Sequence, residues 1–249
     1  MRHPIQGVID TIMATTINKQ RLLTHLFGTA KNSVELDGDT RPVLEQFIYG
    51  VCRENATREQ ADEAYRFLCE KFFDWNEIRV SSLRELEEAF DGMSDAELRS
   101  QRLIAFLQEV FEVQFSFDLD KLQKDGLKQA AKKLARYQAA NDYVVSWAVQ
   151  RSLGGHAIPV DPPTLRCARR LGLVENEQDD AEARASLEHL IPKAKGALFT
   201  DGISTIAGEY CWEEHPQCSS CPLAEECAYA QENGVEALVS SRAHRTKPR

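Results

Sequence analysis

Four of the seven cysteines in this 249-residue chain lie within a short stretch near its C-terminus. Their spacing is C-x6-C-x2-C-x5-C, at Cys211, Cys218, Cys221 and Cys227. The intervening loop has two prolines and too few apolar residues to bury a core, so something other than packing must hold it. Four thiolates this close together indicate a metal or iron–sulfur site.

Three interpretations of this loop are open. Zinc sites usually bring their ligands as two short C-x2-C pairs, whereas only Cys218 and Cys221 form such a pair here. A [4Fe-4S] cluster bound by one wrapped loop suits the uneven spacing better, and we expect it as the cofactor. Disulfides or free thiols are the least favoured, because the first residues contain no apolar signal segment that would indicate an oxidising compartment.

The elements that must position this loop are helices. Apolar residues three or four apart recur along most of the chain, and three capping-box patterns begin at Thr57, Ser82 and Ser94. The alternating stretch from Phe111 to Phe117 has no partner strand, so we expect an extended connection. Further helices are predicted over residues 120–136, 139–153, 163–171, 179–190 and 197–210. The fold class is therefore all-α.

The cysteine spacing resembles the cluster loop of the endonuclease III family, the iron–sulfur branch of the helix-hairpin-helix DNA glycosylases. Two other segments extend the resemblance over about residues 40 to 230. In the first, 157–166, a short apolar run leads to Asp161, which takes the position of the family's catalytic carboxylate. In the second, 43–57, Asn55 takes the position of the residue that fills the space left by a flipped base.

The family's hairpin is where this chain departs from the resemblance. Counting back from Asp161 places Ala139 and Asn141 at the two glycine positions and Tyr143 at the position of the lysine nucleophile. Glycine there would allow positive φ and close backbone approach to a phosphate, so we expect phosphate capture to be weakened or lost. Without the lysine no Schiff base forms, and we expect no lyase activity.

Several of these residues also have purely structural interpretations. Asp161 precedes a helix that opens with proline, which makes it an ordinary N-cap as well as a candidate carboxylate. For Tyr143 a buried aromatic is the favoured interpretation and a pocket residue is the alternative. Lone cysteines on apolar helix stripes are normally small core residues, and this applies to Cys52, Cys69 and Cys167.

The charge of the chain disfavours tight, non-specific binding to nucleic acid. Its net charge is −9, its pI is about 5.3, and Glu213 and Glu214 lie inside the cysteine loop. Two segments, 121–136 and 242–249, are basic and could each contact phosphates. The alternative interpretation is a solvated helix face for the first segment and a free terminus for the second. No apolar run is long enough to span a membrane.

Together these features predict a two-lobed, all-α, helix-hairpin-helix glycosylase-like fold. We expect an N-terminal extension over 1–38, a helical domain over 39–210, the iron–sulfur loop over 211–227 and a basic tail over 228–249. A helix over 5–17 is predicted within the extension.

The resemblance implies a monomeric, monofunctional DNA N-glycosylase of the cytoplasm or nucleoid, acting on double-stranded DNA. The alternative is a non-catalytic iron–sulfur relative that serves as a DNA-binding, protein-binding or redox-responsive module.

Overall fold

The computed structural model describes residues 18–30 and 41–235. Within these ranges the regular elements are α-helices and short 3-10 helices, and no strand is present, as the sequence predicts. No described helix is long and apolar enough to cross a membrane. The predicted helix over 5–17 and the residues of the basic tail from 236 onward lie outside the described residues.

The chain divides into two compact units. Unit 2 consists of Asp37–Asp161 and Ile191–Ala197, and it contains the candidate carboxylate and the hairpin. Unit 1 consists of Met1–Leu36, Pro162–Leu190 and Leu198–Arg249, and it contains the cysteine loop. Each unit is therefore assembled from segments that are distant in the sequence.

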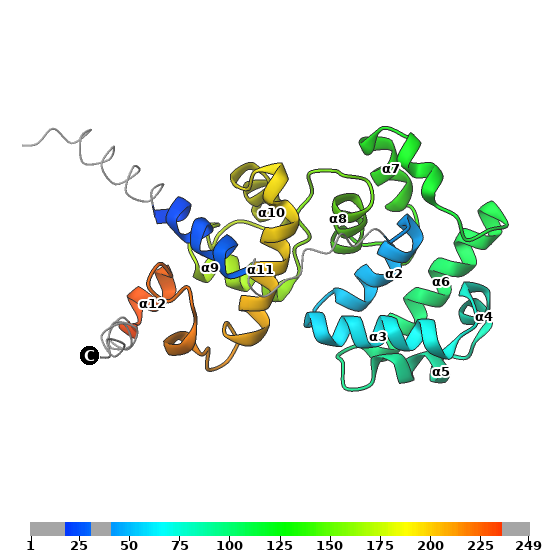
Figure 1. The fold of residues 1–249 in the computed structure, drawn as a ribbon, viewed down its shortest axis with the longest axis horizontal. Coiled ribbons are helices and arrows are strands. Elements are labelled where there is room, and N and C mark those ends of the chain that lie inside the picture. The colour runs from blue at the N-terminus through cyan, green and yellow to red at the C-terminus, as the bar shows by residue number, and fades with distance from the viewer. Residues whose placement is uncertain (1–17, 31–40, 236–249) are drawn as a thin grey trace, which may run out of the picture. The chain divides into compact units, whose positions relative to one another are not determined.

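Unit 2 is built around α2, which neighbours α3, α6 and α8 (Figure 1). Its elements are α2 (Val43–Arg53), α3 (Arg58–Lys71), α4 (Trp75–Val80), α5 (Leu83–Glu87), η1 (Glu88–Phe90), α6 (Ala96–Gln114), η2 (Asp120–Lys124), α7 (Leu127–Leu134), α8 (Asp142–Arg151) and η3 (Lys193–Lys195).

The core of unit 2 explains why α2 is almost completely buried. The ring of Phe47 stacks on that of Phe106 with centroids 3.8 Å apart, and Tyr137 meets both rings edge-on. Gly50 allows α8 to approach closely, because a Cβ there would lie 3.3 Å from a methyl group of Val144. These contacts fix α2 against α6 and α8, the helices from which the candidate site is built.

Unit 1 contains a helix over residues 18–30 together with α9 (Pro162–Arg170), α10 (Asp180–Leu190), α11 (Gly196–Glu209), η4 (Cys218–Ser220) and α12 (Ala228–Glu232). The 18–30 helix packs on α11 at Gly202, where a Cβ would lie only 2.9 Å from Ala30. Its His25 and Arg21 side chains contact the buried Glu226 carboxylate beside the last loop cysteine.

The capping boxes at Thr57 and Ser82 are both present, as predicted. The one predicted at Ser94 is wrong: α6 begins after Asp95, which is left-handed and makes no side-chain cap. The expected extended connection over 111–117 is also wrong in its first half, because α6 continues to Gln114. The predicted helix over 120–136 divides into η2 and α7.

Candidate active site and cysteine site

Asp161 is buried and lies directly before α9. Its Oδ2 accepts a hydrogen bond of 3.0 Å from the backbone N–H of Asn55, in the turn that follows α2. The Asn55 side chain is exposed, and its backbone is left-handed with φ of 53°. Asparagine tolerates this conformation better than most residues. The structure thus brings together two of the residues that the sequence singled out.

Arginine side chains hold the turn that carries Asn55. Arg99 of α6 is 3% exposed, and its guanidinium donates to the backbone carbonyls of Val51 and Glu54 at the end of α2. Arg53 donates to the carbonyl of Ala56 within the turn itself. These bonds satisfy carbonyls that the helix end leaves unpaired, so the turn is fixed from both sides.

Tyr143 lies in the first turn of α8 and is 5% exposed. Burial raises the pKa of its phenol well above the usual range, and the nearby Asp161 carboxylate adds to the rise. The ring stacks on Trp147, whose indole N–H donates to Gln46 at 2.8 Å. Tyr143 is therefore a buried aromatic that lies beside the candidate carboxylate and remains neutral.

The hairpin is the connection from α7 to α8, and it is tied to the end of α2. The Arg102 guanidinium contacts the Glu54 carboxylate at 2.7 Å and donates to the carbonyl of Ala139. The Asn141 side-chain amide donates to the other Glu54 oxygen at 2.7 Å. The partly buried ion pair between Glu54 and Arg102 thus holds both Ala139 and Asn141, the residues at the glycine positions.

The hairpin turn forms without the left-handed backbone that glycine would favour. Among the described non-glycine residues, neither Ala139 nor Asn141 has positive φ. Asn141 is extended, with φ of −138°, and its side chain caps α8 by accepting from the N–H of Val144. The N–H of Gln138 donates to the Glu109 carboxylate at 2.8 Å. Two carboxylates, Glu109 and Glu54, therefore contact this turn.

The four loop cysteines line one small cavity in unit 1. They share it with Cys167 of α9, which is buried as predicted, whereas the expectation of burial is wrong for the exposed Cys69. None of the seven is paired in a disulfide. Within the part of the chain that the structure describes, no three His, Cys, Asp or Glu side chains are arranged as a finished ligand set for one ion.

The surroundings of these thiols fit a thiolate-bound group. A hydrogen bond from Cys167, together with Arg170, 3.6 Å from that sulfur, outweighs burial and lowers the pKa of Cys211 to about 6. Burial raises the pKa of Cys221 to about 12, but the N–H of Leu223 acts in the opposite direction. Burial likewise raises the pKa of Cys227, and the backbone N–H groups of Ala230 and Tyr229 act against that rise. Donors aimed at sulfur and a nearby cation are what an anionic cluster requires.

Arg170 also fixes the loop itself. Its guanidinium donates to the backbone carbonyls of Trp212 and Glu213, and Arg166 donates to the carbonyl of Cys211 at 3.0 Å. Both arginines belong to α9, the helix that begins directly after Asp161. One helix therefore follows the candidate carboxylate and anchors the first half of the cysteine loop.

Sequence reasoning missed the side chains that hold the site, namely Arg99, Arg102, Glu54 and Glu109. One signal was available for Arg99, which shares the apolar stripe of α6 with Leu103 and Phe106. An arginine on such a stripe is buried and needs partners. Those partners are carbonyls of α2, more than forty residues away, and the pattern could not identify them.

Solved structures of DNA glycosylases share this fold. A non-covalent complex of endonuclease III with DNA matches with a TM-score of 0.67 and 19% identity, over 87% of this chain and 98% of that one. A trapped covalent intermediate of endonuclease III with DNA matches with a TM-score of 0.65, and a thermostable thymine-DNA glycosylase does so at 17% identity. The predicted helix-hairpin-helix glycosylase-like fold is confirmed.

The similarity in sequence to curated proteins is weaker than the similarity in fold, and it covers a smaller part of this chain. DEMETER-like protein 3 of Arabidopsis thaliana is 23% identical over 186 residues, which are 68% of this chain and 17% of that protein. Endonuclease III of Bacillus subtilis (strain 168) is 26% identical over 91 residues, which are 36% of this chain and 42% of that protein. No family model matches the chain. With the shared fold, these likenesses confirm the predicted resemblance to the endonuclease III family.

Proposed function

We propose that this protein is a monofunctional DNA N-glycosylase, which removes a damaged or mismatched base from duplex DNA in base excision repair. The observation that carries the proposal is the buried Asp161 carboxylate, held by the N–H of Asn55 with Tyr143 beside it. The proposal also rests on the fold that the chain shares with glycosylases.

In the proposed reaction the bond between C1′ of the sugar and the base nitrogen breaks, and its electron pair leaves with the base. The Asp161 carboxylate stabilises the positive charge that develops on the sugar. A water molecule then adds to C1′ and gives a proton to this carboxylate, which acts as the general base. Asn55, exposed beside it, would fill the space that the flipped base leaves in the stack.

The same site argues against lyase chemistry. A lyase needs an amine that attacks C1′, and Tyr143 offers a buried, neutral phenol at that position. The raised pKa of this phenol keeps it protonated at neutral pH, so it is not a nucleophile. We therefore expect the product to be an intact strand with an abasic site.

Cys211, Cys218, Cys221 and Cys227 would hold the [4Fe-4S] cluster. When bound, the cluster cross-links a loop that has too few apolar residues to hold itself. The chain contributes the N–H groups of Leu223 and Tyr229 and the Arg170 guanidinium, all of which favour thiolates. Its role in the proposal is structural.

One observation favours a second candidate, a non-catalytic iron–sulfur relative. The hairpin turn is contacted by the carboxylates of Glu109 and Glu54, and both would repel a phosphate brought to that turn. A protein that no longer binds DNA through this hairpin would tolerate carboxylates at the turn. The two candidates differ in whether a base is released.

The test is an excision assay with anaerobically purified protein and duplexes that carry an oxidised pyrimidine, an adenine mismatch or a thymine mismatch. Alkali converts an abasic site into a strand break, so cleavage that requires alkali reports base loss without lyase activity. We expect alkali-dependent cleavage of at least one duplex by the wild type. Absence of cleavage by protein with a full cluster would favour the second candidate.

A further inference from the structure

We propose that the exposed lysines of α7 and of the η2 end, Lys124, Lys128 and Lys132, bind the phosphodiester backbone of duplex DNA in place of the hairpin turn. We call them the α7 lysines. This inference rests on the proposed function, because it names the surface by which the protein would hold its substrate.

Positive charge is concentrated in this part of an acidic chain. Residues 120–141 contain six basic and two acidic side chains, whereas the whole chain carries a net charge of −9. Lys128 and Lys132 are one helical turn apart, and the buried face of α7 is formed by Ala130 and Leu134. At 100° per residue the two lysines point away from that face, into solvent.

The other basic residues of the segment lie near carboxylates. Lys133 pairs with Asp125 at 2.8 Å. Lys121, Lys133 and Arg136 line a cavity of about 630 Å³ together with Asp125, Glu109 and Glu112. The α7 lysines neither line this cavity nor form an ion pair with any described residue. They therefore lie away from the carboxylates of that cavity.

Helix stability does not account for Lys128. It lies in the first turn of α7, where the helix dipole disfavours a cation, and this turn contains no acidic residue. Lys132 lies in the last turn, where a cation is favourable, so stability alone would explain it. Lys128 therefore costs the helix a little stability, and a partner with negative charge would offset that cost.

The hairpin turn next to α7 is a poor place for a phosphate. Its Gln138 N–H is bonded to the Glu109 carboxylate, and its Asn141 amide is bonded to the Glu54 carboxylate. Lys132 is only six residues before Gln138 in the sequence and belongs to the same hairpin. A phosphate strand that approaches this hairpin therefore finds the lysines more favourable than the turn.

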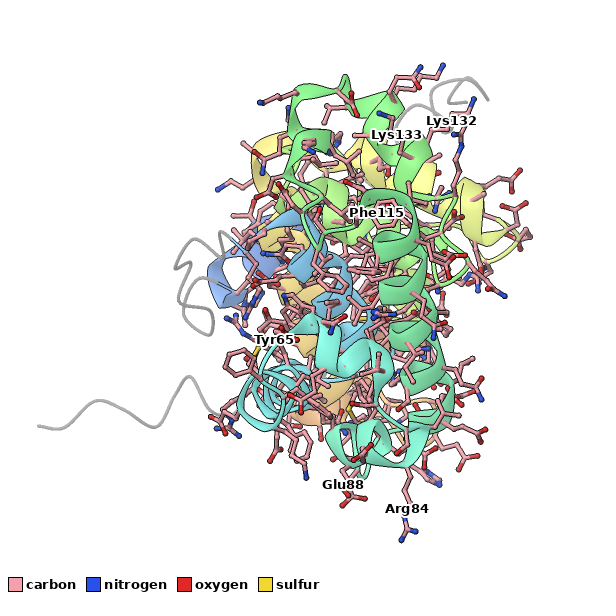
Figure 2. All side chains as sticks on the ribbon, turned by 90° about the vertical axis from the view of Figure 1, so that its right-hand side faces the viewer. Tyr65, Arg84, Glu88, Phe115, Lys132 and Lys133 are labelled. Carbon is pink, nitrogen blue, oxygen red and sulfur yellow. The ribbon has the colours of Figure 1, made fainter. Side chains whose placement is uncertain are left out.

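The test measures binding of a short, undamaged, fluorescent duplex to the full protein at several salt concentrations. The double variant Lys128→Gln/Lys132→Gln removes two exposed positive charges. The matched control, Arg66→Gln/Arg84→Gln, removes two from α3 and α5 of the same unit. Figure 2 shows Lys132 and Arg84 projecting at opposite ends of the view.

We expect the plot of log binding constant against log salt to become shallower by about 1.8 for the lysine variant, since each phosphate contact contributes about 0.9. The control should keep the wild-type slope. Lys128→Glu changes the net charge by the same amount as the double variant and should also weaken binding, while leaving Tm unchanged or raising it, because it places an acid in the first turn. If Lys128 served only the stability of the helix, weaker binding would not occur together with an unchanged or higher Tm.

Equal slopes for the wild type and the lysine variant would overturn the inference, even if a base is excised. A shallower slope without any excision would support the surface and count against glycosylase chemistry. A wild type that does not bind duplex at low salt would also overturn the inference, and an acidic protein would then be the partner to seek.

Discussion

The backbone N–H of Asn55 donates to Oδ2 of Asp161 at 3.0 Å, although the two residues are 106 positions apart in the sequence. The bond depends on the left-handed backbone of Asn55, with φ of 53°. In this geometry one residue orients the carboxylate through its backbone and presents its side chain to solvent. The orientation of the carboxylate is thus coupled to the backbone conformation of Asn55.

Two substitutions at Asn55 distinguish the role of its left-handed backbone from the role of its side chain. Asn55→Gly keeps the left-handed conformation, and we expect the free energy of unfolding to change by less than about 0.5 kcal/mol. Asn55→Val should lose roughly 1–2 kcal/mol, because a β-branched residue resists positive φ. Urea unfolding checks both, and equal stability of the two variants would contradict the coupling.

The Glu54–Arg102 pair should hold the hairpin. Its side chains are only 15% and 17% exposed. Arg102→Met removes the donor to Oε2 of Glu54 and the donor to the Ala139 carbonyl, and leaves Glu54 only its bond from Asn141. We expect Arg102→Met to lower the free energy of unfolding by about 1–3 kcal/mol. In a double-mutant cycle with Glu54→Gln, the interaction energy between the two residues should be at least about 0.5 kcal/mol.

Lys71→Met is the control for this cycle, because Lys71 forms a half-exposed ion pair with Glu88. Lys71→Met should lower the free energy of unfolding by less than about 0.5 kcal/mol, as is usual when a solvated ion pair is removed. Similar losses for Arg102→Met and Lys71→Met would show that the hairpin does not depend on the Glu54–Arg102 pair.

The sequence predicted the local features of the fold and missed those that depend on distant contacts. The boxes at Thr57 and Ser82 close within four residues, so their residues suffice to identify them. Ser94 carries the same pattern, but its carbonyl accepts from the Arg99 guanidinium and α6 starts differently. The same guanidinium is held by the distant carbonyls of Val51 and Glu54, so tertiary contacts outweigh the local preference there.

The aromatic stretch shows the same limit. Alternation from Phe111 onward indicates an extended segment, yet the first residues continue α6. The Phe111 ring stacks near Phe117 at 5.6 Å and lies under the Arg79 guanidinium at 4.5 Å. The contact with Arg79, which no short window contains, favours the longer helix. For the candidate site, likewise, Asp161 and Asn55 were predicted but the arginines that hold their turn were not.

Removal of one loop cysteine should abolish cluster binding. Cys218→Ser leaves three thiolates, and we expect iron, sulfide and the brown absorbance to fall together, with a lower Tm. Cys69→Ser is the matched control, because Cys69 is exposed and outside the cysteine cavity. Anaerobically purified wild type should contain about four iron atoms per chain. Zinc without sulfide would contradict the assignment.

The buried tyrosines predict a loss of stability at high pH. Burial raises the pKa of Tyr49, Tyr65 and Tyr143 in the folded protein above the unfolded value of about 10. The unfolded chain therefore releases these protons first, and the stability they contribute is complete below about pH 10 and falls above it. Ultraviolet titration of the phenols alongside urea unfolding measures both effects. Ionisation of all six tyrosines near pH 10 without unfolding would contradict the burial of these rings.

The most direct test of the account is single-turnover base release by the wild type and by Asp161→Asn, on the duplex that the wild type cleaves best after alkali. Free base is quantified by mass spectrometry, and borohydride trapping reports any Schiff base. We predict base release by the wild type, a fall of at least a hundredfold for Asp161→Asn at unchanged duplex affinity, and no trapped complex with either protein. Equal rates for the two proteins, or a borohydride-trapped adduct, would contradict the assignment of Asp161 as the carboxylate of a monofunctional glycosylase.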